Sequence, residues 1–477
     1  MNRLALAALL AAAFLLALGL RVFGADHPFE SADNVELALR AMNNRNIVWI
    51  FGERYGYLNP LSVKLGSAIW SDAFGQTMTE AMWKLPVALM GAAQTLLAYA
   101  FARRLGASEE GSIGLAFVTA VLPLHVMQSR YLWGYEVFGV FFLCLALWAL
   151  LNFLERPSHE TSLTAGASVA LYLVSHGFVV PFFPSVVALF LLIRGREAWS
   201  LVRTHRALWL LPAMYLPFLA PAIQHTSDKQ AQAGFYLFRY LEPAVANLGV
   251  PIALVVVAGW TLGRKHLPLL TIALLYFAPL MFGARPGSTV ARGYMLVGSY
   301  LLTFGALLNL DRLIGGWPKR LGFAVLVALT GWGTVAAIRG TDGVMAIRIE
   351  RGGIPNNPGT KAAGLYVREH VGAEHRILAV GVPLEPPTVE YYLGREATSF
   401  YDLPPATLQS VLDREIDGHD VVLAPNHLAL PNSFQVVAEF EGSDLVVSSR
   451  VPLPSVRVSV AEADVRFDRT VGIRALF

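Results

Sequence analysis

Residues 135–154 read YEVFGVFFLCLALWALLNFL, and Glu136 is the one charged side chain in that run. A helix needs about 20 mostly apolar residues to cross the hydrocarbon core of a bilayer, because each residue rises by only about 1.5 Å. This stretch meets the requirements of both length and composition. It therefore predicts a membrane-spanning helix and sets the pattern for the rest of the chain.

Further stretches share this apolar character, although several are short or contain proline. They lie near residues 4–23, 85–102, 111–127, 162–176, 178–194, 207–223, 244–262, 267–283, 294–310 and 320–338. Of the 477 residues, 55% are hydrophobic and 15% are charged, whereas soluble domains carry about 25% charged residues. We predict a polytopic α-helical membrane protein with about eleven transmembrane helices.

Charge and cysteine usage exclude two classes of site. The net charge of +3 is small and the Lys and Arg residues form no stripe, whereas nucleic-acid binding needs a clustered basic surface. Cys144 is the single cysteine, so no internal disulfide can form, and no Cys/His spacing typical of zinc sites is present. We expect no nucleic-acid partner and no zinc site.

Positive charges in the loops indicate the orientation. With the N-terminus in the cytoplasm, most Lys and Arg residues of the short connections fall on the cytoplasmic side, for example Arg103, Arg104 and Arg203. We predict a multi-pass plasma (inner) membrane protein with a cytoplasmic N-terminus. The alternative for the first apolar run is a cleaved signal peptide, with Val22 and Gly24 as small residues before the cut.

The segment 24–84 is longer than an ordinary connection, and such segments are usually functional or disordered. Its many aromatic residues favour order. Apolar residues recur at helical spacing from Asp33 to Met42 and again from Pro60. We expect two amphipathic helices at the membrane surface, in the first extracytoplasmic loop of a transmembrane domain that covers residues 1–339.

The pattern changes after the polar linker 351-RGGIPNNPGT-360. Helix-like segments at 361–371 and 386–393 alternate with strand-like runs. These runs lie at 376–380, 421–424, 435–440, 444–449 and 455–459. We predict that residues 340–477 form an extracytoplasmic (periplasmic) soluble α/β domain.

Asp33 is the first candidate for chemistry, because no nucleotide-binding, serine-hydrolase or zinc-protease signature is present. It follows the first predicted span and precedes a predicted helix. With Glu36 three residues later it matches the capping-box pattern, in which side chains bind the first backbone amides of a helix. The other interpretation is a general base that takes a proton from a hydroxyl group. Both stay open on the residues alone.

Two stretches resemble the GT-C superfamily of polyprenyl-phosphate-sugar-dependent glycosyltransferases, which includes protein O-mannosyltransferases and lipid A aminoarabinose transferases. The first is 31-SADNVELALRAMNNRNIVWIFGERYGYLNPLSVKLGSAIWSDAFG-75, with an acidic residue, a surface helix, a Gly/Tyr segment, a Pro-Leu helix start and a closing Phe-Gly. The second is 125-HVMQSRYLWGYEVFGVFF-142, which contains an Arg and a downstream acid. The chain departs from the family at Asn34, where Glu is usual, and at Leu58–Leu61, which lacks a Lys that some relatives carry.

The resemblance implies a polyprenyl-phosphate-linked sugar donor, membrane lipid as surroundings, and an acceptor hydroxyl on a protein, lipid or glycan. Asp33 matches the catalytic base of the family, and Glu136 is a second catalytic candidate. Arginine binds phosphate through paired donors. The candidate ligands of the donor phosphate are Arg130, Arg54, Arg239 and Arg292. The alternative for these residues is an interfacial cation or, for Glu136, a paired acid. No cofactor is indicated, although a divalent metal is compatible with the chemistry.

We therefore expect an inverting membrane glycosyltransferase that acts on the extracytoplasmic side. A transporter or flippase of a lipid-linked saccharide is the first alternative, although transporters usually show internal repeats and charges in mid-span. A non-catalytic membrane scaffold that presents the C-terminal domain is the second. Removal of residues 340–477 would abolish the function of such a scaffold, whereas changes at Asp33 would be silent.

Overall fold

The computed structural model describes residues 2–25, 32–43, 50, 57–74, 78–132, 134–175, 200–201, 203–213, 248–283, 289–339, 358–382, 386–400, 403–460 and 462–463. The chain divides into two compact units. The helical unit consists of Met1–Ala25, Asn44–Leu65 and Lys84–Gly353. The C-terminal unit consists of Asp26–Asn43, Gly66–Trp83 and Ile354–Phe477.

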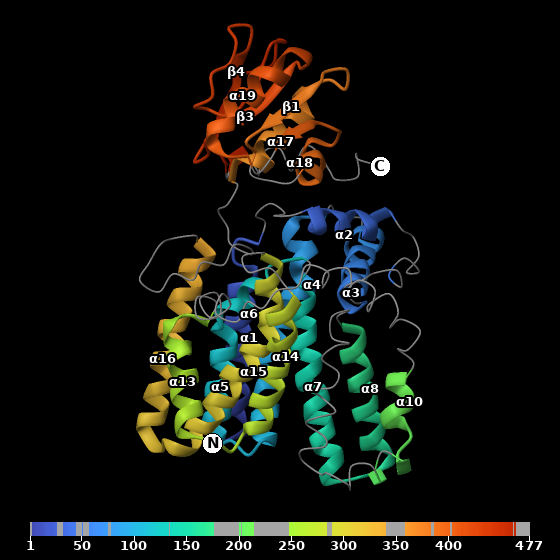
Figure 1. Cartoon of the computed structure of the whole chain (residues 1–477), viewed down its shortest axis with the longest axis vertical. Helices are drawn as coiled ribbons and strands as arrows, with labels where there is room; N and C mark the ends of the chain where they lie inside the picture. Colours follow the sequence, from blue (N-terminus) through green and yellow to red (C-terminus); the bar gives the residue numbers. More distant parts are fainter. Residues whose placement is uncertain are drawn as a thin grey trace. The chain divides into compact units, whose positions relative to one another are not determined.

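Long helices that run side by side make up the helical unit (Figure 1). They are α1 (Arg3–Val22), α3 (Leu58–Ser67), α4 (Glu80–Arg104), α5 (Glu109–Val121), α6 (Pro123–Gln128), α7 (Tyr135–Glu155), α8 (His159–Ser175), α10 (Ala207–Ala213), α13 (Val250–Leu262), α14 (Leu267–Gly283), α15 (Thr289–Leu313) and α16 (Gly316–Arg339). Gly66 and Ser67 of α3 and residues 80–83 of α4 are grouped with the C-terminal unit. Among the described helices, the most extensive contacts join α7 with α8, α14 with α15, α8 with α10, and α13 with α15.

Several of these helices require an apolar solvent. Among the described helices, α1, α4, α7 and α16 are long and apolar enough to cross a membrane, and α13 and the first part of α14 are shorter apolar helices. Large apolar side chains point outward, with Leu254, Val257 and Trp332 exposed by 66%, 63% and 73%. Water would oppose such exposure by about 25 cal/mol per Å², whereas lipid does not. The helical unit therefore belongs in a membrane, and the count of eleven spans stays a prediction.

One predicted span is broken in the structure. The run 111–127 forms two helices, α5 and α6, which are separated at Leu122. Leu122 has φ −62° and ψ 116°, an extended conformation, and Pro123 begins α6. The proline ring disfavours a helical residue before it and lacks an amide hydrogen, so it ends one helix and starts the next. The predicted span 178–194 and most of 207–223 lie outside the described residues.

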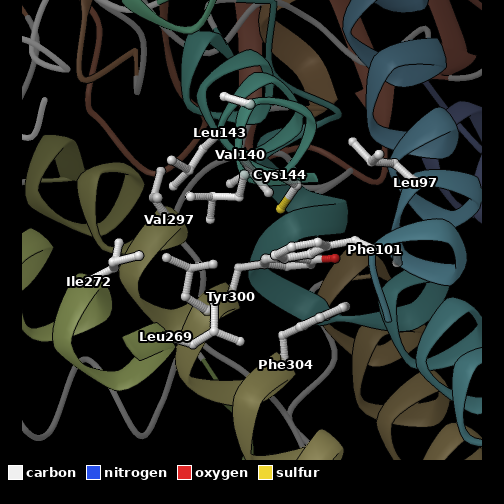
Figure 2. Packing of buried hydrophobic residues seen from close by; sticks show 14 of the residues in the cluster. Leu97, Phe101, Val140, Leu143, Cys144, Leu269, Ile272, Val297, Tyr300 and Phe304 are labelled. Carbon is white, nitrogen blue, oxygen red and sulfur yellow. The ribbon is translucent and has the colours of Figure 1, made fainter. Parts of the chain in front are cut away.

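The core of the helical unit is formed by side chains from helices that are distant in sequence. Figure 2 shows Phe101, Tyr300 and Phe304 close together, with Cys144 and Leu97 beside them. The rings of Phe101 and Phe304 are stacked, with centroids 5.2 Å apart and planes 17° apart. Such aromatic pairs contribute about 0.5–1.5 kcal/mol beyond burial. This cluster joins α4, α7 and α15.

The C-terminal unit contains a six-stranded sheet in the order β2-β1-β3-β5-β4-β6 (Figure 1). The strands are β1 (Ile377–Val380), β2 (Thr398–Phe400), β3 (Val421–Pro425), β4 (Gln435–Glu441), β5 (Leu445–Ser449) and β6 (Val456–Ser459). β1 is parallel to β2 and β3, β5 is antiparallel to β3 and β4, and β6 is parallel to β4. The helices α17 (Pro358–His370), α18 (Pro386–Leu393) and α19 (Pro405–Glu415) accompany it.

The predicted elements of this region are present, and two further ones were not predicted. The two predicted helices are α17 and α18, and the predicted strand-like runs are β1, β3, β4, β5 and β6. The strand β2 is short and only partly buried, so it leaves a weak apolar signal. The helix α19 buries Leu408, Val411 and Leu412, which is a helical spacing that the sequence does display.

Two helices also occur in the predicted loop 24–84. They are α2 (Ala32–Asn43) and α3, which continues as a π-helical turn over Ala68–Ala73. The turn was not predicted. The helix α2 belongs to the C-terminal unit. A position of these helices at the membrane surface stays a prediction.

Candidate functional site

The side chain of Arg130 holds the C-terminal end of α1. Its Nη1 donates to the carbonyl oxygens of Leu20 at 2.9 Å, Arg21 at 3.3 Å and Phe23 at 2.7 Å. Its Nη2 lies 3.5 Å from the carbonyl oxygen of Gly24. Arg130 is fully buried. The last carbonyls of a helix lack partners within the helix and carry partial negative charge. A buried cation at this place therefore satisfies both their hydrogen bonds and their charge.

Lys84 of α4 holds the next residue of the same segment. Its Nζ donates to the carbonyl oxygen of Ala25 at 3.1 Å, and Lys84 itself is buried. Gly24 has a φ of 60°, a left-handed conformation that glycine adopts without strain. The amide of Ala25 donates back to the carbonyl oxygen of Val22 at 3.1 Å. The chain therefore leaves α1 in a direction fixed by two buried cations.

A second buried arginine, Arg21, lies in the last turn of α1. Its Nη1 donates to the carbonyl oxygens of Ala17 at 2.8 Å and Ala120 at 3.2 Å, and its Nη2 lies 2.7 Å from Nδ1 of His125. Because a guanidinium only donates, Nδ1 of His125 is the acceptor in this pair. At Gly91, an added Cβ would lie 2.6 Å from Nε of Arg21. Glycine at this position thus makes room for the arginine.

The turn between α6 and α7 carries Arg130. The amide of Gly134 donates to the carbonyl oxygen of Tyr131 at 3.1 Å. At Gly134 an added Cβ would lie 2.4 Å from the carbonyl oxygen of Gln128, so the tightness of the turn requires glycine. Glu136 follows in the first turn of α7 and is buried. A carboxylate is favoured there by the positive end of the helix dipole.

The start of α3 is joined to the same region. The side-chain Nδ2 of Asn59 donates to the carbonyl oxygen of Leu132 at 3.1 Å, and Asn59 is buried. The amide of Tyr57 donates to the carbonyl oxygen of Val174, at the end of α8, at 2.8 Å. Burial raises the pKa of the Tyr57 phenol above its ordinary value. The candidate site thus gathers the end of α1, the turn after α6, and the starts of α3 and α7.

Asp33 stands on α2, which begins at Ala32. The capping-box pattern predicted that Asp33 is the capping residue before the helix. In the structure it is instead the second residue of the helix. A carboxylate in the first turn is still favoured by the helix dipole. The side chain of Asp33 lies outside the described part of the chain, so its role as a base stays a prediction.

The other predicted site residues are placed to different extents. Arg130 and Glu136 are buried within the same short segment. Arg54 and Arg239 lie outside the described residues, and the structure describes only the backbone of Arg292, on α15. The two shortest of the hydrogen bonds given above for Arg130 go to the carbonyls of Leu20 and Phe23, at the end of α1. The phosphate-binding role of all four arginines stays a prediction.

Sequence analysis did not single out Arg21, Lys84 or His125 as parts of this site. An ionisable residue at membrane depth is costly unless it is partnered. Arg21 and His125 each interrupt or end an apolar run, and this signal could have identified them. Among the residues that the structure describes, no group of three or more His, Cys, Asp or Glu side chains could hold a metal ion.

A protein-family model matches part of this chain. Residues 63–225 match the family model described as dolichyl-phosphate-mannose-protein mannosyltransferase. A search among curated proteins finds no matching sequence.

Solved structures match over most of the chain. ArnT from Cupriavidus metallidurans, in a crystal structure bound to undecaprenyl phosphate, has a TM-score of 0.56 and 13% sequence identity, and the match covers 94% of this chain and 98% of ArnT. The archaeal oligosaccharyltransferase AglB from Archaeoglobus fulgidus, in complex with an inhibitory peptide and a dolichol-phosphate, has a TM-score of 0.54 and 15% identity over 88% of this chain and 69% of AglB.

These matches confirm the predicted resemblance to the GT-C superfamily. ArnT and AglB are polyprenyl-phosphate-dependent glycosyltransferases of that superfamily. At 13–15% identity, the likeness shows a shared fold. The chain is thus a helical membrane protein with a GT-C fold.

Proposed function

We propose that this chain with a GT-C fold is a membrane glycosyltransferase, which transfers a sugar from a polyprenyl-phosphate donor to an acceptor hydroxyl. The observation that carries the proposal is the match to ArnT, which covers 94% of this chain and 98% of a protein solved with undecaprenyl phosphate. A match of that extent includes both the membrane helices and the C-terminal sheet. The family model at residues 63–225 names the same chemistry, transfer of mannose from a lipid phosphate.

The proposed reaction is a direct displacement. The carboxylate of Asp33 takes the proton of the acceptor hydroxyl. The oxygen attacks the anomeric carbon, the bond from that carbon to the phosphate oxygen breaks, and polyprenyl phosphate leaves with the bonding electron pair. One displacement inverts the anomeric configuration. Asp33 is assigned this role because it matches the acidic residue that acts as the base in the GT-C superfamily, and it lies in the first turn of α2.

The leaving phosphate needs positive charge as it develops. We assign this role to Arg130, Arg54, Arg239 and Arg292. The geometry of Arg130 supports a shaping role as well, since it fixes the end of α1 through three carbonyls. We place the reaction on the extracytoplasmic side of the plasma membrane, with a cytoplasmic N-terminus and residues 340–477 outside the cytoplasm. The acceptor is a protein, lipid or glycan, and Glu136 is a second catalytic candidate.

The test compares cells that lack the protein with cells that express wild type, Asp33→Asn or Glu36→Gln. Glu36 lies on the same helix, is largely exposed and pairs with Arg40, so its change controls for loss of a carboxylate on α2. Mass spectrometry of envelope glycans and lipids is the readout. We expect one sugar modification to be missing in the deletion, and restored by wild type and Glu36→Gln but not by Asp33→Asn.

The proposal fails if Asp33→Asn, inserted at wild-type levels, restores the modification fully. Transport of a lipid-linked saccharide by the purified protein in vesicles, without any glycosylated product, would instead support a flippase. A modification that needs residues 340–477 but is indifferent to Asp33 would support a scaffold.

A further inference from the structure

The helix α2 is packed as part of the C-terminal unit. Its residues Val35, Ala38 and Ala41 are buried, at a spacing that forms one helical face, and Leu37 is buried as well. The helix α2 packs against α18. In turn α18 packs on α17, and α17 packs on β4 and β5. A continuous path of contacts therefore connects the sheet with the helix that carries Asp33.

A buried polar cluster joins this path to the first turn of α4. Oε2 of Glu80 lies 3.0 Å from Nζ of Lys361 on α17, and their side chains are only 5% and 2% exposed. The hydroxyl of Tyr392 on α18 donates to Oε1 of Glu80 at 3.1 Å. One carboxylate thus binds both helices at once. We call Glu80, Lys361 and Tyr392 the clamp.

The helices α17 and α18 pack closely where Gly364 meets Tyr392. At Gly364 on α17, an added Cβ would lie 2.6 Å from Cβ of Tyr392 and 3.1 Å from its carbonyl carbon. Val389 and Leu393 of α18 are buried on the same short helix. Close packing fixes the hydroxyl of Tyr392 with respect to α17. The clamp therefore sets one register for α17, α18 and the start of α4.

A buried ion pair adds little net stability, because desolvation of the charges offsets most of their attraction. The ion pair instead raises the free energy of any other arrangement, because a shifted helix would leave a charge buried without its partner. Apolar contacts alone would hold the same helices together with less control of their position. The buried charges of Glu80 and Lys361 therefore indicate that the clamp fixes the relative position of these helices.

We propose that Glu80, Lys361 and Tyr392 are positioning residues, which hold α2, and with it Asp33, to the C-terminal domain. This inference rests on the proposed function of Asp33 as the base. The C-terminal domain then has a direct role in the reaction, because an acceptor bound to it and the base on α2 belong to one body. Loosening of the clamp lowers the turnover rate without weakening the binding of the lipid donor.

The experiment uses the full-length protein in lipid nanodiscs and four variants. Tyr392→Phe removes only the hydroxyl that reaches Glu80. Tyr366→Phe is its matched control, because that hydroxyl also lies in the C-terminal unit but donates to the carbonyl oxygen of Pro454. Lys361→Met leaves Glu80 buried without its cation. The double variant Glu80→Gln with Lys361→Met removes both charges and keeps an acceptor for Tyr392.

Two quantities are measured: kcat and KM with the lipid-linked sugar, and hydrogen exchange of the α2 amides. We expect kcat to fall roughly fivefold in Tyr392→Phe and more than tenfold in Lys361→Met, with KM unchanged. The double variant recovers most of the lost kcat. The α2 amides exchange faster in Tyr392→Phe and Lys361→Met, and at the wild-type rate in Tyr366→Phe.

The inference is overturned if the α2 amides of Tyr392→Phe and Lys361→Met exchange as in wild type while both variants keep the wild-type kcat. It is also overturned if the double variant is as slow as Lys361→Met, since removal of the unpaired charge should restore the position. Asp33→Asn is measured in parallel. If that variant is active, the proposed function fails, and the exchange rates of α2 still decide whether the clamp exists.

Discussion

Nη1 of Arg130 lies 2.7 Å from the carbonyl oxygen of Phe23, across a sequence separation of 107 residues. This contact fixes the end of α1, from which the chain enters the segment that carries Asp33. A side chain on the turn after α6 therefore helps to hold the end of the first helix. The end of α1 therefore depends on a contact between residues that are distant in sequence.

Replacement of Arg130 by lysine tests this dependence. A lysine ammonium lacks the planar fork with which arginine reaches several carbonyls at once, so some of the carbonyls of α1 lose their partner. We expect a loss of about 1–3 kcal/mol in stability and at least tenfold lower transfer activity. Thermal unfolding in detergent and the activity assay measure the two effects.

Arg103→Lys is the control for this change. Arg103 also donates from Nη1 to a backbone carbonyl, that of Ala107 at 2.6 Å, but it does so in a partly buried place away from the site. Its replacement should leave activity within twofold of wild type. Equal activity losses in the two variants would show that the end of α1 has no special role.

Gly111 tests the packing between α5 and α15. An added Cβ would lie 2.0 Å from Oδ1 of Asp311, which binds Nζ of Lys319 at 2.7 Å and the hydroxyl of Ser108 at 2.6 Å. Gly111→Ala must push this buried carboxylate away from both partners. We expect a loss of about 2 kcal/mol or more, measured as a lower unfolding temperature.

Gly322 on α16 provides the matched comparison, because nothing lies within 4 Å of its added Cβ. In that open place, alanine favours the helix by up to about 1 kcal/mol. Gly322→Ala should therefore unfold at the wild-type temperature or slightly above it. If the two alanine variants behave alike, helix propensity and not the Asp311 contact controls the stability.

The environment of Asp420 indicates that the stability of the C-terminal unit decreases in acid. Its carboxylate accepts from the amide of Arg376 at 3.1 Å and from Nε of Arg450 at 3.0 Å. The backbone hydrogen bond from Arg376, followed by the hydrogen bond and charge of Arg450, lowers the pKa of Asp420 below its ordinary value. A lowered folded-state pKa stabilises the fold above the unfolded pKa of about 3.9, and this contribution is lost as the pH falls through the folded value.

Asp420→Asn should therefore flatten the pH dependence of stability below about pH 4. Hydrogen exchange of the β1 and β3 amides in the full-length protein, measured across that pH range, follows the effect. Asp413→Asn, which changes an exposed carboxylate on α19 that binds Gln409, is the comparison. A wild-type pH dependence in Asp420→Asn would contradict the assignment.

Asn59 tests the link between α3 and the turn after α6. In Asn59→Asp, an ionised carboxylate faces the carbonyl oxygen of Leu132 in place of the donor that now lies 3.1 Å from it. A buried charge and an unpaired carbonyl result, and we expect at least about 2 kcal/mol of destabilisation. Ser62→Ala removes a hydrogen bond within the same helix, to the carbonyl oxygen of Asn59, and should change the stability by under about 0.5 kcal/mol. Unfolding temperatures that fall equally would argue against the link.

The local sequence predicted most helices and strands because hydropathy and spacing act over a few residues. The apolar run 135–154 becomes α7, and the strand-like run at 444–449 becomes β5. The break at Leu122 was missed, since the apolar run continues through it and only the geometry of Pro123 ends the helix. The short strand β2 was missed because its side chains are partly exposed.

The candidate site was predicted only in part. A resemblance pointed to Asp33, Arg130 and Glu136, and the fold match agrees with that resemblance. The partners of these residues could not be predicted, because a sequence does not state which distant groups will meet. In the sequence, nothing distinguishes Lys84 from the other cations of the long segment 24–84, and only the structure brings its ammonium to the carbonyl oxygen of Ala25. Arg21 was one more residue at the end of a predicted span.

By itself, the sequence determined that this chain enters a membrane and which segments become helices or strands, because the transfer of apolar side chains out of water depends on local composition. Only the tertiary structure decided that Arg130 closes α1 and that Glu80 binds Lys361 on α17. Those contacts join groups far apart in the chain. They form because a buried charge must find a partner wherever the fold brings one within reach.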